Sequence, residues 1–216
     1  MKIHYKVKEI HSKVYLVTTK DSYDLAMLFC RVQEFYESPF KQIKGHGFSM
    51  PEFQRMYAKK FGDGVFTYPH DWVGFNVPSS AIHDCYSGHH QIDINEYDDE
   101  MIGIYYDCLP DDETFYVIGS PEGDDDTIKH ETAHALYSLH KNYKKEADKI
   151  VKSLDKEIYN SMKNNLKALG YCSAVTNDEI QAYLVSNVSA ICDFSPSKIK
   201  KQKQAIDNLF ENFKGD

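Results

Sequence analysis

Apolar and polar residues alternate near the start of the chain, and the pattern changes to helical spacing farther along. Over residues 2–19 the alternation is interrupted by a polar break at residues 11–13, which predicts a β-hairpin. The apolar positions of this hairpin are Ile3, Tyr5, Val7, Val14 and Leu16. The next apolar residues recur every three or four positions, so we expect a helix that begins at Asp21 or Ser22 and ends before Pro39.

Local start and stop signals divide the middle of the chain. Ser49–Glu52 reads as a capping box with a proline in the first turn, and it predicts a helix that ends near Gly62. Residues 62–92, rich in Gly, Pro, Tyr and His, are expected to form loops with short elements, before a candidate helix at residues 95–108. A short strand, Phe115–Ile118, is expected to close at the glycine that follows it.

The C-terminal half is predicted to be helical throughout. Asp126 or Thr127 can cap a helix that contains His130, and Gly170 is typical of the residue just after a helix end. The expected helices span about residues 127–142, from 144 into the 150s or 160s, from 176 onward, and about 197–213. The whole pattern favours an α+β fold that is mainly helical with a small β-sheet.

Composition and charge narrow the class of protein. Twelve Phe and 16 Tyr among 216 residues indicate a folded chain, and no stretch of about 18 apolar residues predicts a membrane span. The net charge is −8, and residues 92–128 hold 13 acidic residues without Lys or Arg, so a broad nucleic-acid-binding face is not expected. Five dispersed cysteines without a CxxC pair favour reduced thiols in a cytoplasmic setting.

The sequence His130-Glu131-Thr132-Ala133-His134 is an HExxH motif. Residues four apart on a helix lie only about 40° from one another, so the two imidazoles can bind one metal ion. Glu131 points about 80° away from their mean direction, where its carboxylate can reach water at the metal and act as a general base.

A catalytic zinc site needs a third protein ligand, and two residues are candidates. His140 follows His130 by ten residues, but in an unbroken helix it lies about 9 Å beyond His134 and is rotated by about 120°. An exposed histidine at a helix end is the preferred interpretation. Glu179, in the first turn of a later helix, is the better candidate, although it could instead complete a capping box that begins at Thr176.

With these residues in place, the chain resembles the gluzincin branch of the zincin metallopeptidases. The resemblance covers about residues 115–185. It implies a zincin-like active-site helix followed by a second ligand-bearing helix, with one Zn²⁺ bound by His130, His134 and Glu179 and with Glu131 as the catalytic base.

The resemblance also implies supporting roles. Phe115–Ile118 would be an edge strand that pairs with the substrate backbone. Related sites use a Tyr or His to stabilise the oxyanion, for which Tyr183 is the first candidate and Tyr116 the second. Asp178 is a candidate for holding the free nitrogen of a ligating imidazole, or it is simply a helix-start residue.

The resulting prediction is a cytoplasmic zinc endopeptidase that acts on peptide or protein substrates, with signal-less secretion left open. We expect a single domain of residues 1–216, in which residues 1–70 could form an N-terminal lobe and residues 110–216 the catalytic portion. One alternative is a catalytically inactive, zincin-like metal-binding module for partner recognition. Another is a metal-dependent hydrolase of a non-peptide amide or ester, which needs the same ligands.

Overall fold

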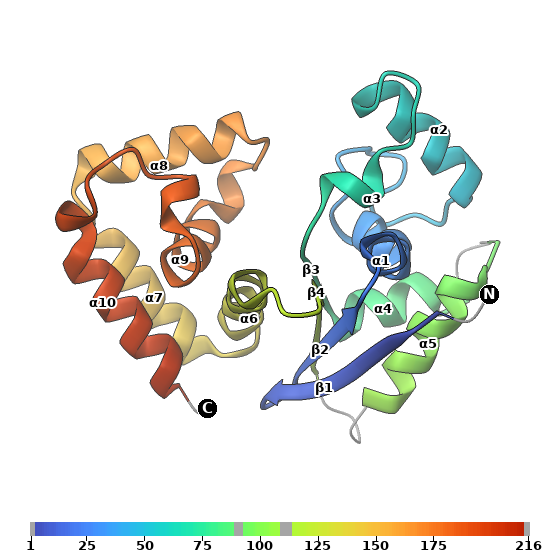
Figure 1. Ribbon diagram of the computed structural model, residues 1–216, viewed down its shortest axis with the longest axis horizontal. Coiled ribbons are helices and arrows are strands. Elements are labelled where there is room, and N and C mark those ends of the chain that lie inside the picture. The colour runs from blue at the N-terminus through green and yellow to red at the C-terminus, as the bar shows by residue number, and fades with distance from the viewer. Residues whose placement is uncertain (1–2, 89–92, 109–113, 214–216) are drawn as a thin grey trace. The chain divides into compact units, whose positions relative to one another are not determined.

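The computed structural model describes residues 3–88, 93–108 and 114–213, and the chain divides into two compact units (Figure 1). We call residues 1–124 the N-terminal unit and residues 125–216 the C-terminal unit. The fold is mainly helical with one small sheet, so the predicted α+β class is confirmed. The single-domain assignment stays a prediction.

The sheet lies in the N-terminal unit and has the strand order β1-β2-β4-β3. Its strands are β1 (Tyr5–His11), β2 (Val14–Thr19), β3 (Phe75–Pro78) and β4 (Tyr116–Pro121). The predicted hairpin is confirmed: β1 and β2 are antiparallel, and Lys13 in the turn has a positive φ of 64°. β2 pairs in parallel with β4, which in turn pairs antiparallel with β3.

Two expectations for the fourth strand are wrong. β4 has a neighbour on each side, so it is an internal strand and has no free edge for a substrate. The strand also continues through Gly119 instead of ending there. A Cβ at Gly119 would lie 2.5 Å from the ring of Phe29, so glycine is needed here for the close approach of helix α1 (Ser22–Glu37) and not for a turn.

Five helices of the N-terminal unit are described around this sheet: α1 (Ser22–Glu37), α2 (Met50–Phe61), α3 (Tyr68–Asp71), α4 (Ser79–Tyr86) and α5 (Glu96–Cys108). Two predicted caps are confirmed, because Asp21 accepts from the Tyr23 amide and Ser49 from the Glu52 amide. The buried Arg31 of α1 donates two hydrogen bonds, 2.8 and 2.9 Å long, to the Asp98 carboxylate of α5.

The described part of the C-terminal unit is all helical. It contains α6 (Asp125–Leu139), α7 (Lys141–Lys152), α8 (Lys156–Ala168), α9 (Thr176–Val185) and α10 (Pro196–Asn212), with 3-10 turns η1 (Ser173–Val175) and η2 (Val188–Ala190). One apolar core joins them, and it includes the fully buried residues Ala133, Leu136, Tyr143, Ile180 and Ala182. The predicted terminator Gly170 is confirmed, with a φ of 99° just beyond the end of α8.

Two further sequence expectations concern the whole chain. All five cysteines are free thiols, three of them buried. Within the described ranges, no helix combines the length and the apolar character needed to cross a bilayer.

Candidate metal centre

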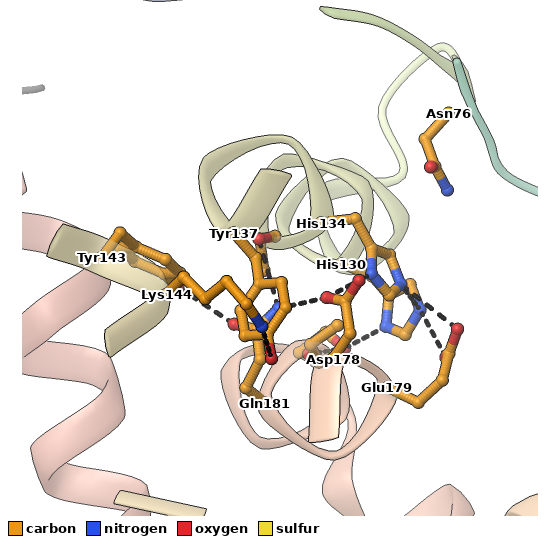
Figure 2. A network of polar contacts seen from close by, with 12 residues as sticks. Asn76, His130, His134, Tyr137, Tyr143, Lys144, Asp178, Glu179 and Gln181 are labelled. Atoms are coloured by element: carbon orange, nitrogen blue, oxygen red, sulfur yellow. Dashed lines mark hydrogen bonds and ion pairs between the residues drawn. The ribbon is translucent and has the colours of Figure 1, made fainter. Parts of the chain in front are cut away.

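Helix α6 presents the two histidines of the HExxH motif to one point. Their ring centroids are 4.8 Å apart, and the two Nε2 atoms face each other at 3.2 Å (Figure 2). His130 and His134 sit one helical turn apart, which is the reason that both rings reach the same place. The expected convergence of the two imidazoles is therefore present.

The other nitrogen of each ring has a partner that determines where the proton lies. His134 Nδ1 is 2.9 Å from Asp178 Oδ1, and because an ionised carboxylate only accepts, His134 donates from Nδ1. His130 Nδ1 is 3.1 Å from Ser186 Oγ, whose own hydroxyl donates to the Ala182 carbonyl oxygen at 2.9 Å. Ser186 Oγ is therefore the acceptor for His130, and because each ring donates through Nδ1, the two Nε2 atoms are the ones that face each other.

Glu179 of helix α9 completes the group. Its carboxylate oxygens lie 3.7 Å from His134 Nε2 and 3.9 Å from His130 Nε2, and one ligand atom from each of the three residues lies within 4.8 Å of the others. Two tetrahedral ligands about 2.0–2.1 Å from zinc are about 3.3 Å apart, close to the separation of the two imidazoles. The carboxylate is only about 0.5 Å farther out than that spacing. Two imidazole nitrogens beside a carboxylate therefore form a set of ligand atoms that fits a divalent cation such as Zn²⁺.

The protonation of the pair is unequal. Burial, together with the neighbouring His134, lowers the pKa of His130. Burial alone would also lower the pKa of His134, but the carboxylates of Asp178 and Glu179 outweigh it and raise this pKa. The site thus concentrates negative charge around one imidazole and favours a positive charge at its centre.

The start of α9 differs from the predicted capping box. Thr176 is the first helical residue and not the N-cap, which is Val175 and makes no side-chain cap hydrogen bond. The Thr176 hydroxyl donates instead to the Ser173 carbonyl oxygen at 3.1 Å. The capping role considered for Glu179 is therefore not present, and its carboxylate is directed towards the two histidines (Figure 2).

Glu131 and two tyrosines lie around the same point. Glu131 is 7% exposed. After Asp178 and Glu179, its negative charge contributes to the raised pKa of His134. It also contributes to the raised pKa values of Tyr171 and Tyr183, for which burial and the charge of Glu179 are larger causes. The Tyr183 ring meets the His130 ring edge-on with centroids 4.6 Å apart, and its hydroxyl is 3.4 Å from that of Tyr171. The surroundings of the group thus include a further carboxylate and two phenol groups.

Tyr171 was not singled out from the sequence, although a local signal exists. Its amide donates to the Leu166 carbonyl oxygen and the Gly170 amide to that of Lys167, which is the Schellman pattern at the end of α8. This turn fixes the backbone of Tyr171 just after the helix. Two other side chains at the site, Ser186 and Gln181, carry no comparable sequence signal.

His140 and Tyr116 complete the set of candidates named from the sequence. His140 is the N-cap of α7, just after the end of α6, and it is buried against the Phe213 ring with centroids 5.0 Å apart. The expectation that it is exposed is wrong, and the group that could hold a metal ion, as found among the described residues, does not include it. Tyr116 belongs to strand β4 of the N-terminal unit, where its hydroxyl lies 3.4 Å from Asn76 Oδ1.

Comparisons of this chain with models of protein families, with curated proteins and with solved structures find no match.

Proposed function

We propose that this chain is a zinc-dependent endopeptidase whose reaction centre lies in the C-terminal unit. The observation that carries the proposal is the convergence of His130 Nε2, His134 Nε2 and the Glu179 carboxylate, with Glu131 next to the first ligand in sequence. The gluzincin-like order of these residues supports a peptide bond as the substrate. A purely structural metal site does not require a buried carboxylate such as that of Glu131, whereas a hydrolytic site requires a general base.

In the proposed hydrolysis, the metal ligands, Glu131 and Tyr183 have separate roles. A zinc ion held by the three ligands would acidify water and polarise the scissile carbonyl. The Glu131 carboxylate accepts a proton from the attacking water, whose oxygen forms the new bond to the carbonyl carbon. Glu131 then returns the proton to the amide nitrogen as the C–N bond breaks. Tyr183, whose ring meets His130 and whose hydroxyl lies 3.4 Å from that of Tyr171, would donate a hydrogen bond to the negative charge that develops on the substrate oxygen.

The test is the variant Glu131→Gln, which keeps the shape of the side chain and removes its basicity. We expect one zinc ion per chain in both proteins, measured by elemental analysis, and a loss of cleavage of about 10²–10⁴-fold in the variant. Cleavage is read by mass spectrometry on a library of unstructured peptides. Glu146→Gln, an exposed carboxylate on α7 that pairs with Lys149, is the matched control and should cleave like the wild type.

Three other outcomes of this experiment would each contradict a part of the proposal. Full cleavage by Glu131→Gln would refute the assigned role of this carboxylate. Stoichiometric zinc without cleavage of any peptide would refute the peptidase and favour the binding module, or, if simple esters are hydrolysed, the non-peptide hydrolase. A wild-type chain that takes up no zinc from solution would refute the metal site itself.

A further inference from the structure

Gln181 is a buried polar side chain that joins three helices behind the metal-binding group. Its exposed fraction is 0%, and it lies on α9 one turn after Asp178. Its Nε2 is 3.1 Å from Asp178 Oδ1 and 3.2 Å from the carbonyl oxygen of Ala133 on α6. Its Oε1 is 3.1 Å from the hydroxyl of Tyr143 on α7 (Figure 2). One amide therefore links α9 to α6 and to α7, the helix that directly follows α6.

The partners of this amide allow only one orientation. A main-chain carbonyl and an ionised carboxylate can only accept, so the two hydrogens of Nε2 must point at Ala133 and Asp178. Oε1 then accepts from Tyr143, which is fully buried as well. Turning the amide over would set its oxygen against both acceptors in a place without solvent, which is strongly unfavourable.

Gln181 and His134 donate to the same oxygen atom, Oδ1 of Asp178. Asp178 Oδ1 accepts from Gln181 and, at 2.9 Å, from His134 Nδ1. The Asp178 side chain is 26% exposed, so without the bond from Gln181 the carboxylate could rotate towards water. The imidazole would then lose the acceptor of its Nδ1–H, the contact that keeps Nε2 directed at the shared point.

We propose that Gln181 is a positioning residue of the metal centre: through Asp178 it holds His134 in the tautomer that offers Nε2 to a divalent cation. It also ties α9, which carries Glu179, to the backbone of α6 between the two histidines. The inference rests on the metal site of the proposed function and does not depend on peptide cleavage.

The experiment compares Gln181→Met with the wild type in the full chain. Methionine keeps the length of the side chain and removes both donors. We expect the affinity for Zn²⁺, measured by competition with a chromophoric chelator, to fall about 10–100-fold, as is usual when support of a ligating histidine is lost. In the metal-free protein, ¹⁵N-edited NMR of the imidazoles should show a protected Nδ1–H on His134 in the wild type and its loss in the variant.

Two further variants separate positioning from stability. Ile180→Val removes one methyl group from a fully buried neighbour on α9 and should leave both readouts unchanged. Tyr143→Phe keeps Gln181 but removes its donor, and we expect a two- to fivefold weaker affinity for zinc; this variant serves if Gln181→Met does not fold.

Wild-type zinc affinity and an unchanged Nδ1–H signal in Gln181→Met would overturn the inference while leaving the proposed function intact. If the wild type binds zinc but cleaves no peptide, the proposed function fails and the Gln181 result still stands. Equal losses in Ile180→Val and Gln181→Met would show that Gln181 only stabilises the fold, and would also overturn the inference.

Discussion

The two imidazoles of the candidate metal centre are held by different partners, and this difference predicts unequal effects when each partner is removed. His134 donates to the Asp178 carboxylate and His130 to the neutral hydroxyl of Ser186. Hydrogen bonds to charged groups contribute about 1.5–3 kcal/mol, against about 0.5–1.5 kcal/mol for neutral pairs. Loss of the carboxylate charge should therefore weaken metal binding more than loss of the hydroxyl.

The magnitudes follow from what each variant leaves behind. Asp178→Asn keeps an oxygen acceptor at the same position but removes the charge, and we expect zinc affinity to fall about 10–100-fold, or about 1.4–2.8 kcal/mol. Ser186→Ala leaves the Ala182 carbonyl, which also hydrogen-bonds to His130, so a two- to fivefold loss is expected.

Competition with a chromophoric chelator measures both affinities under identical conditions. Asp193→Asn, an exposed carboxylate that accepts from Asn165 at 2.9 Å, is the control for general charge and should bind zinc like the wild type. An equal loss of zinc affinity in Ser186→Ala and Asp178→Asn, or an affinity of Asp178→Asn within twofold of the wild type, would refute the predicted difference.

Two further predictions concern the N-terminal unit. Burial raises the pKa of Glu34 from 4.5 to about 7, so the folded state binds its proton more tightly than the unfolded state, and stability falls by about 3 kcal/mol as the pH rises from about 4.5 to above 7. Urea unfolding at pH 5 and pH 8 should show this fall in the wild type and its loss in Glu34→Gln; parallel pH dependence of the two proteins would contradict it. Gly119→Ala places a Cβ 2.5 Å from Phe29, and thermal unfolding should show a loss of about 1–3 kcal/mol that Phe29→Leu partly restores. An unchanged melting temperature would disprove the close-contact argument.

Local signals account for most of what the sequence predicts correctly. The caps at Asp21 and Ser49 and the terminator Gly170 each act within four residues, so they can be read without knowledge of the tertiary fold. The HExxH pair belongs to the same class, because His130 and His134 lie one turn apart on a single helix. These signals are independent of how the helices pack.

The errors arise where a residue has a second, tertiary role. Gly119 carries a turn signal, but the approach of a phenylalanine ring requires glycine inside a strand. Thr176 carries a capping signal, but η1 places it inside the helix and gives its hydroxyl the Ser173 carbonyl. The internal position of β4 depends on pairing with β2, about a hundred residues earlier, which no local pattern reveals.

The packing of α6 against α9 brings together the three residues that could hold a metal ion. Glu179 follows His134 by 45 residues, and the two helices meet because small apolar residues lie on their contacting faces. Ala133 and Ala182, both fully buried, allow the backbones to approach closely enough for an amide on one helix to reach a carbonyl on the other. The polar group of His130, His134 and Glu179 would be unfavourable at such an interface if its charges were not balanced. The apolar core thus supplies the free energy that holds the three ligands together, and a bound cation would neutralise the carboxylate that this packing brings against the two imidazoles.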